Sequence, residues 1–232
     1  MQLTAERVKT LLREGDVEIL GLLPGASNYT FAVTVADPEL KVVAVYKPQA
    51  GETPLWDFAD GTLWRREIAA YELSEALGWS LVPPTVERDG PEGIGSMQLY
   101  IEHDPEQHYF TLMPEHAATF MRVALLDHVM NNADRKAGHC LLETSSKRIW
   151  VVDHGVCFHA DPKLRTVIWD FAGEPIPVEL LIELERADLG VLRPWLTAYE
   201  LDIAMKRRTE LLAARAFPDP PEDRRAYPWP PV

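Results

Sequence analysis

Residues 126–142 read LDHVMNNADRKAGHCLL, and residues 151–155 read VVDHG. The first stretch begins inside an apolar segment, residues 117–130, which predicts a buried helix. It ends in a short apolar strand. The second stretch closes another short strand. Between the helix and the first strand lies a polar loop with an acid, two cations and a histidine: Asp134, Arg135, Lys136 and His139. The pattern predicts a helix, a polar loop and a two-stranded hairpin that is flanked by Asp134 and Asp153.

Short apolar stretches dominate the first hundred residues. Helices are expected at 1–15 and 63–77. Strands are predicted at residues 17–23, 31–35, 42–47, 82–86 and 95–101. The first three strands follow one another through turn residues, which favours an antiparallel meander.

The second half of the chain is predicted to be mainly helical. Helices are expected at 117–130, 177–188 and 194–214, the last two with a proline at the favourable first position. A proline-rich tail, 217–232, is expected to be extended. The layout indicates an α+β protein with a β-rich lobe at 1–101, a helical lobe at 102–216 and a hinge near 102–116.

Composition and charge restrict the class of protein. The chain has 232 residues, 47% of them hydrophobic, and a formal net charge of −13, which together indicate a packed globular protein. No apolar run reaches the roughly 18 residues of a membrane span, and the N-terminus has no secretion signal. Two cysteines make no disulfide framework. A cytoplasmic protein that binds no nucleic acid and does not insert into a membrane is therefore expected.

The negative charge is unevenly spread along the chain. Residues 117–165 hold seven basic and five acidic side chains, a net charge of +2, which leaves −15 for the rest. A cationic segment in an acidic protein is suited to a phosphate-bearing ligand. Chance alone explains such a balance equally well.

Three features upstream of the polar loop also fit a phosphate-binding protein. The turn GLLPGASN, 21–28, places small residues where backbone N–H groups can approach phosphates, with Ser27 and Asn28 as candidate contacts. Lys47 ends an apolar strand and could aim its ammonium into a cleft. Glu67, on the next helix, could hold that lysine in position. Taken singly, each has a plainer reading: a hairpin turn, a solvent-exposed lysine and a solvated glutamate.

Phosphoryl transfer requires a carboxylate that orients the acceptor hydroxyl, ligands for a divalent cation, and positive charge near the phosphates. Asp134 meets the first requirement, and His139 with Asp153 meets the second. Lys47 with Arg135 or Lys136 meets the third. Two aspartates that flank one predicted hairpin are less easily explained as ordinary turn residues than either would be alone.

The order of these motifs resembles a known family. The glycine-containing turn, Val-Tyr-Lys47, Arg66-Glu67-Ile-Ala-Ala-Tyr, Asn-x-Asp134-Arg135 and Val-Asp153-His-Gly155 are similar to the phosphatidylinositol 3-/4-kinase-related group. That group includes type II phosphatidylinositol 4-kinases and HipA-type bacterial serine kinases. The likeness spans about residues 20–158 and is strongest to short bacterial proteins that are labelled phosphatidylinositol-kinase-like.

The resemblance implies a two-lobed protein-kinase-like fold that binds ATP between its lobes. It makes Lys47 the phosphate-binding lysine, Glu67 its helix partner, Asp134 the catalytic-loop aspartate and Asp153 the principal metal ligand. Residues 97–101 become the strand that receives adenine through backbone groups, with Gln98, Leu99 and Tyr100 as the expected contacts. The expected cation is Mg²⁺ or Mn²⁺. His139 stands where the family usually has a metal-binding asparagine, and a neutral imidazole can ligate a metal but favours softer ions than Mg²⁺.

Two other readings remain open. The chain could be a nucleotide-binding regulatory module without catalysis, which the histidine at position 139 favours. It could also hold a transition metal, through some of His139, Cys140, Asp153, His154, Cys157 and His159, although the spacing matches no zinc pattern closely. A serine hydrolase is disfavoured because the sequence has no Gly-x-Ser-x-Gly motif.

The expected partners are ATP and an unidentified acceptor that bears a hydroxyl group. Asp161, Asp170 and Glu174 follow the second aspartate motif and would oppose an anionic membrane. A protein hydroxyl or a small metabolite is therefore expected as the acceptor, rather than a lipid.

Overall fold

The computed structural model describes residues 4–24 and 28–232. Its first part is a five-stranded antiparallel sheet in the order β1-β2-β3-β5-β4. The strands are β1 (Asp16–Leu22), β2 (Phe31–Ala36), β3 (Lys41–Pro48), β4 (Thr85–Gly90) and β5 (Gly93–Leu99). The predicted meander of the first three strands is confirmed. The last two strands form a hairpin in which β4 extends to Gly90, beyond the predicted end at residue 86. The chain turns only after Gly90, which pairs with Gly93.

Helix α1 (Ala5–Glu14) covers the sheet and completes a small hydrophobic core. Val8, Leu11 and Leu12 lie on one face of the helix and are buried, as the helical spacing predicts. Gly15 ends the helix against the sheet, since a Cβ at this position would lie 2.9 Å from the carbonyl oxygen of Ala36. No side chain larger than hydrogen fits that approach.

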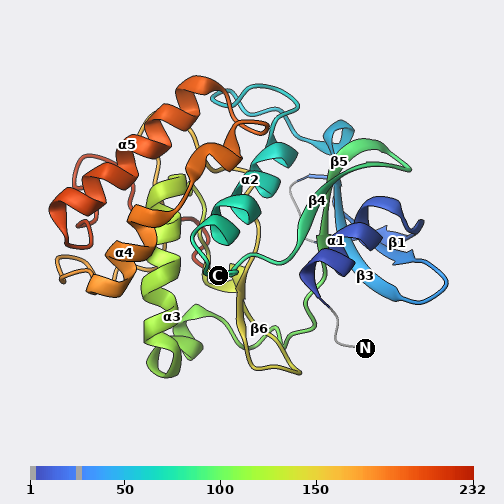
Figure 1. The fold of residues 1–232 in the computed structure, drawn as a ribbon, viewed down its shortest axis with the longest axis horizontal. Coiled ribbons are helices and arrows are strands. Elements are labelled where there is room, and N and C mark those ends of the chain that lie inside the picture. The colour runs from blue at the N-terminus through green and yellow to red at the C-terminus, as the bar shows by residue number, and fades with distance from the viewer. Residues whose placement is uncertain (1–3, 25–27) are drawn as a thin grey trace.

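Helix α2 (Leu63–Ala76) lies between the sheet and the remaining helices (Figure 1). Ala69, Ala70 and Leu73 are fully buried and belong to the large core of the second part of the chain. The carboxylate of Glu52 accepts the N–H of Trp64 at 2.8 Å and so caps the start of the helix. Because it packs on both parts, α2 fixes the position of its own Glu67 relative to each of them.

Helix α3 (Tyr109–Met130) begins eight residues earlier than the sequence predicted, so most of the expected hinge is helical. Pro114 lies inside this helix, and His116 has non-helical angles of φ −123° and ψ 22°. Proline lacks the N–H of a helical hydrogen bond and crowds the preceding turn, which accounts for the kink. The apolar pattern becomes regular only beyond this kink.

The polar loop follows α3 through Asn131, which caps the helix in a left-handed conformation. A short 3₁₀ turn, η2 (Ala137–His139), leads into the hairpin of β6 (Cys140–Leu142) and β7 (Ile149–Val151). The predicted helix, polar loop and hairpin are therefore confirmed as elements.

The closing helices start later than predicted. Helix α4 (Val178–Arg186) has Pro177 as its cap, and a 3₁₀ turn, η3 (Leu189–Leu192), precedes α5 (Ala198–Ala214). Thr197 and Glu200 exchange side chain–backbone hydrogen bonds at the start of α5. This capping box determines where α5 begins, and Pro194 lies before the helix.

The tail, 217–232, is not helical. The division of the chain at 101/102 and 216/217 stays a prediction, although the buried apolar side chains do form one cluster at the sheet and a larger one among the helices. Within the described ranges, no helix combines the length and the apolar character of a membrane span.

Candidate active site

Three side chains from distant parts of the sequence meet at Lys47. Its Nζ donates a short hydrogen bond to Glu67 Oε1 and lies 2.9 Å from Asp153 Oδ1. Lys47 is on β3, Glu67 is on α2, and Asp153 follows β7. The Glu67 carboxylate is buried, whereas 53% of the Asp153 side chain is exposed. The ammonium is therefore held from behind by one carboxylate, and the other carboxylate faces solvent.

The charges of the three groups reinforce one another. Burial by itself would lower the pKa of Lys47, but the carboxylates of Asp153 and Glu67 outweigh it and raise that pKa. The Lys47 ammonium in turn holds the pKa of Asp153 well below its usual range. A lysine cation and an aspartate anion are both retained at neutral pH.

The backbone at Asp153 contributes to this arrangement. Asp153 has φ +63°, a left-handed conformation that is uncommon for a residue other than glycine. The next N–H, of His154, donates to Glu67 Oε2 at 2.9 Å. Glu67 thus holds Lys47 with one oxygen and the bend after Asp153 with the other.

His139 lies on the second oxygen of the same aspartate. Its Nε2 is 3.3 Å from Asp153 Oδ2, and its Nδ1 accepts the N–H of Lys136 at 3.4 Å. Burial lowers the pKa of His139 to about 4, so the imidazole is neutral at pH 7. A neutral ring that accepts at Nδ1 carries its proton on Nε2, toward Asp153.

Asp134 is the acid of the polar loop. Its N–H donates to Asn132 Oδ1 at 3.0 Å, and its Oδ2 lies 3.3 Å from Lys136 Nζ. Partial burial raises the pKa of Asp134, against the opposite effect of Lys136. The carboxyl group is one-third exposed, which leaves it accessible to an acceptor.

Arg135 does not lie where the sequence analysis expected a phosphate-binding cation. It is fully buried, and its guanidinium donates to Asp127 from Nε at 3.0 Å and from one terminal nitrogen at 2.9 Å. The other terminal nitrogen donates to the carbonyl of Val152 at 2.9 Å. His154 Nε2 lies 2.7 Å from the guanidinium. Arg135 therefore positions the residues on either side of Asp153 and cannot contact a phosphate from this position.

The partner of that arginine, Asp127, was missed by the sequence analysis. Asp127 is fully buried and also accepts the side-chain N–H of Asn132 at 3.0 Å. The available signal was a carboxylate in an otherwise apolar helix, since such a group is rarely buried without a charged partner. The spacing of residues along the sequence does not identify which basic side chain pairs with Asp127.

The strand expected to receive adenine uses its own donors internally. The N–H of Leu99 donates to the Pro84 carbonyl at 2.9 Å, and the N–H of Tyr100 donates to the Val43 carbonyl at 3.0 Å. The buried side chain of Gln98 donates to Thr85 Oγ1 at 2.8 Å. These three groups cannot donate to a base while these bonds persist.

The glycine-containing turn is only partly described. Ser27 lies outside the described residues. Asn28 Oδ1 accepts the N–H of Thr53 at 2.8 Å, which ties this turn to the loop after β3.

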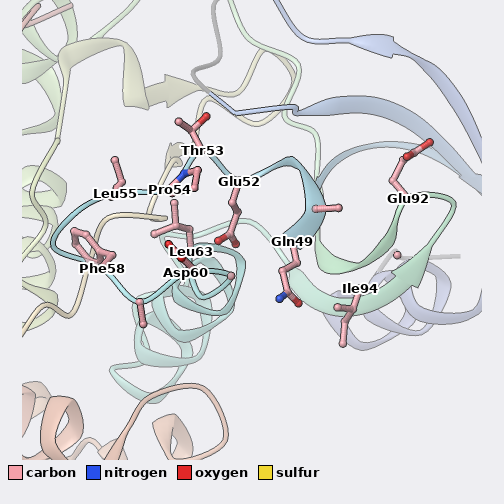
Figure 2. Close-up of a pocket in the computed structure, with 14 residues that line it drawn as sticks. Gln49, Glu52, Thr53, Pro54, Leu55, Phe58, Asp60, Leu63, Glu92 and Ile94 are labelled. Carbon is pink, nitrogen blue, oxygen red and sulfur yellow. The ribbon is translucent and has the colours of Figure 1, made fainter.

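Two cavities lie beside this site rather than in it. The first, about 430 Å³, lies between the loop of residues 49–63 and the β4–β5 turn, and Figure 2 shows its acidic Glu52, Asp60 and Glu92. The second, about 370 Å³, lies between the loop at Asp57 and the start of α5. Neither lining includes Lys47, Asp134 or Asp153.

The described residues contain no group of three or more His, Cys, Asp or Glu side chains that could hold a metal ion. Of the six residues considered for a transition metal, Cys140, His154 and Cys157 are fully buried. Asp153 and His139 form a pair instead. A pair suits a cation that completes its ligand shell with phosphate oxygens and water.

Sequence comparison finds one matching family model and two similar proteins. Residues 82–187 match the family model described as phosphatidylinositol 3- and 4-kinase. The chain is 36% identical to Protein Rv2133c of Mycobacterium tuberculosis over 95% of its own length and 94% of that protein. It is 27% identical to phosphatidylinositol 4-kinase gamma 4 of Oryza sativa subsp. japonica, over 49% of this chain and 24% of the rice protein.

Solved structures show the same fold at low sequence identity. The Golgi casein kinase with Mn/ADP bound matches with a TM-score of 0.54 and 15% identity, over 98% of this chain and 80% of that chain. The Helicobacter pylori proinflammatory kinase CtkA matches with a TM-score of 0.55 and 11% identity, over 89% and 94%. The fold is therefore an α+β, protein-kinase-like one.

Proposed function

Because this chain belongs to one family with Rv2133c, in the phosphatidylinositol 3- and 4-kinase-related group of atypical kinases, we propose that it is an ATP-dependent phosphotransferase. It moves the γ-phosphate of ATP to a hydroxyl group of a soluble protein or a small molecule.

One observation carries the proposal. Lys47 Nζ contacts the carboxylates of both Glu67 and Asp153, although 106 residues separate Lys47 from Asp153. The buried Glu67 holds the Lys47 ammonium in place, and the exposed Asp153 lies next to that ammonium. A fixed positive charge for phosphates and a carboxylate that can bind a metal ion are therefore adjacent. Triphosphate binding needs both charges at one place.

The roles follow from the contacts. Lys47 binds phosphate oxygens, and Glu67 keeps its ammonium in position. Asp134, whose carboxyl group is accessible, accepts the proton of the acceptor hydroxyl. The acceptor oxygen forms a bond to the γ-phosphorus as the bond to the bridging oxygen of ADP breaks, and Lys47 and Lys136 offset negative charge near the transferred group.

The residues present fit a divalent cation. Asp153 offers the type of oxygen ligand that Mg²⁺ and Mn²⁺ prefer, and its side chain is half exposed. The neutral imidazole of His139 lies against the same carboxylate. We assign these two residues as its ligands. When bound, such a cation offsets the negative charge of the phosphates.

Two substitutions test the proposal. Asp153→Ala is expected to abolish metal-dependent ATP binding, measured as the ATP-induced shift in melting temperature. Asp134→Ala is expected to leave that shift intact and to lower transfer on the order of 10²-fold or more, because it removes a general base. An Asp153→Ala protein whose ATP-induced shift equals that of the unmodified chain would contradict the site.

A regulatory module that binds nucleotide without catalysis is the second candidate. The Asp153–His139 pair favours this module, because it offers one carboxylate and an imidazole instead of the expected carboxylate and asparagine amide oxygen. Turnover assays with Mg²⁺ and Mn²⁺ in parallel separate the two candidates. ATP binding without hydrolysis, autophosphorylation or transfer in either metal supports the module and excludes the enzyme.

A further inference from the structure

The C-terminal segment, residues 226–231, lies against the loop that carries Asp134. The carbonyl of Pro231 accepts the N–H of Ala137 at 2.8 Å. Ala137 comes three residues after Asp134 and two before His139. In Figure 1 the C-terminus lies in the middle of the molecule near β6, so the tail returns from α5 to the centre of the fold.

A second attachment lies at the other end of the same segment. The carbonyl of Ala226 accepts the N–H of Thr166 at 3.0 Å and the indole N–H of Trp169 at 3.1 Å. Thr166 forms a parallel bridge with Arg135. Residues 165–167 therefore lie between the tail and the loop, and the tail supports the loop on both sides of Lys136.

The chemistry of the segment suits this contact. Ala137 is fully buried and begins a 3₁₀ turn, so its N–H has no partner within that turn. An unpaired buried N–H is unfavourable. Proline has a carbonyl but no N–H, so Pro231 supplies the acceptor without adding a donor that would itself need a partner. Pro228, between the two attachments, is buried, whereas Trp229 is 75% exposed.

We propose that residues 226–231 are a positioning segment, which holds residues 134–137 in the conformation needed for phosphoryl transfer. The role rests on the proposed function and deepens it, because it assigns part of the catalytic geometry to the end of the chain. The hydrogen bonds of the segment run to Ala137, Thr166 and Trp169, to which no contact with the phosphates is assigned. Its removal should therefore affect transfer and spare nucleotide binding.

The test compares the full chain with a chain that ends at Arg225. Hydrogen exchange at the Ala137 amide is expected to be slow in the full chain and fast after truncation. The rate of transfer is expected to fall on the order of 10²-fold, since small misplacements of catalytic groups have that effect. The ATP-induced shift in melting temperature is expected to persist, because Lys47, Glu67 and Asp153 keep their contacts. The carbonyl of His139 also keeps its hydrogen bond from the Val152 N–H at 3.0 Å, which does not involve the tail.

Two further measurements separate positioning from general loss of structure. A synthetic peptide AYPWPPV, residues 226–232, is expected to restore both transfer and Ala137 protection to the truncated protein. Trp229→Ala in the full chain is the matched control, because it removes an exposed side chain and keeps both carbonyl contacts. It should have the transfer rate and the exchange rate of the unmodified protein.

Unchanged Ala137 exchange after truncation would overturn the contact. Faster exchange with an unchanged transfer rate would overturn the positioning role and leave the proposed function standing. Absence of transfer by the full chain in either metal would overturn the proposed function and with it the positioning role, whereas the exchange data would still report the contact. A truncated protein that loses its ATP-induced shift and is not restored by the peptide would also count against the proposal.

Discussion

At the scale of single residues, the three carboxylates of the site differ in their exposure and in their contacts with lysine. Glu67 is buried behind Lys47, Asp153 is exposed in front of it, and Asp134 is paired with Lys136 on the separate loop. The surroundings of Asp153 and Asp134 shift the pKa values of these two acids in opposite directions. The Asp153 pKa is held low by Lys47, and the Asp134 pKa is raised by burial.

The raised pKa of Asp134 predicts an acid limb in the pH profile. Asp134 must be ionised to accept a proton, so kcat is expected to fall as pH decreases, starting above the ordinary range of an aspartate. Lys136 lowers the pKa of Asp134, and its loss in Lys136→Gln should move this limb to higher pH. The measurement is kcat against pH for both proteins. A limb that stays at the same pH in Lys136→Gln would argue against Asp134 as the base.

The identity of residue 139 predicts the preference for metal. The proton of the neutral imidazole points from Nε2 toward Asp153, so ligation through this atom requires the proton to move. An amide oxygen requires no such movement and suits a hard cation better. His139→Asn is therefore expected to raise the ratio of activity with Mg²⁺ to activity with Mn²⁺. An unchanged ratio would exclude His139 as a ligand.

At the scale of elements, helix α3, the polar loop and the hairpin are joined by one buried ion pair. Asp127 on α3 and Arg135 on the loop are both fully buried, and Arg135 also reaches the Val152 carbonyl after β7. Burial by itself would lower the pKa of Arg135, but the Asp127 carboxylate outweighs burial and raises that pKa. Arg135 therefore keeps its positive charge. The pair determines the path of the loop.

Loss of that pair predicts a large decrease in stability. Asp127→Asn leaves a buried arginine without its counter-ion, which is expected to lower the free energy of unfolding by about 3–5 kcal/mol. Denaturant unfolding measures it. Asp202→Asn on α5 is the matched control, because Asp202 is exposed and such substitutions change stability by less than about 0.5 kcal/mol. Equal stability of the two variants would show that the pair is not needed.

Helix α2 is attached to the second part of the chain next to its functional residue. Arg66 donates to the Cys157 carbonyl at 2.8 Å and to Glu200 at 2.6 Å, and the next residue is Glu67. Glu200 also belongs to the capping box of α5. The start of α5 is thereby connected to the position of the Lys47 partner.

At the scale of the whole molecule, the two hydrophobic clusters differ in size. Among the residues that the structure describes, the cluster at the sheet contains nine buried residues, and the cluster among the helices is much larger. Strand β1 lies at the edge of the sheet and most of its residues are exposed. Local opening is easiest where few apolar contacts and an unprotected edge coincide.

This difference predicts the order of hydrogen exchange. Amides of β1 are expected to exchange faster than those of residues 123–126 in α3, whose side chains are buried in the larger cluster. Mass spectrometry of exchanged peptides measures both regions in one experiment. Equal protection of β1 and the centre of α3 would show that the molecule opens only as one unit.

Much of the local structure was predictable from the sequence. Apolar periodicity identified α1, α2 and the strands of the meander, and the polar loop with its hairpin placed Asp134 and Asp153 as flanking acids. Starts of helices were less predictable. The kink at His116 hides the first turns of α3, and the capping box at Thr197 outweighs Pro194.

The sequence by itself determined the kinds of element, their order and the residue types available for chemistry, because periodicity, turn residues and caps act over a few neighbouring positions. Only the tertiary structure decided which charges meet. Arg135 pairs with Asp127 rather than with a phosphate, and the tail contacts Ala137. Burial explains both outcomes, because a buried charge or N–H must find a partner wherever the fold brings one near, regardless of distance along the chain.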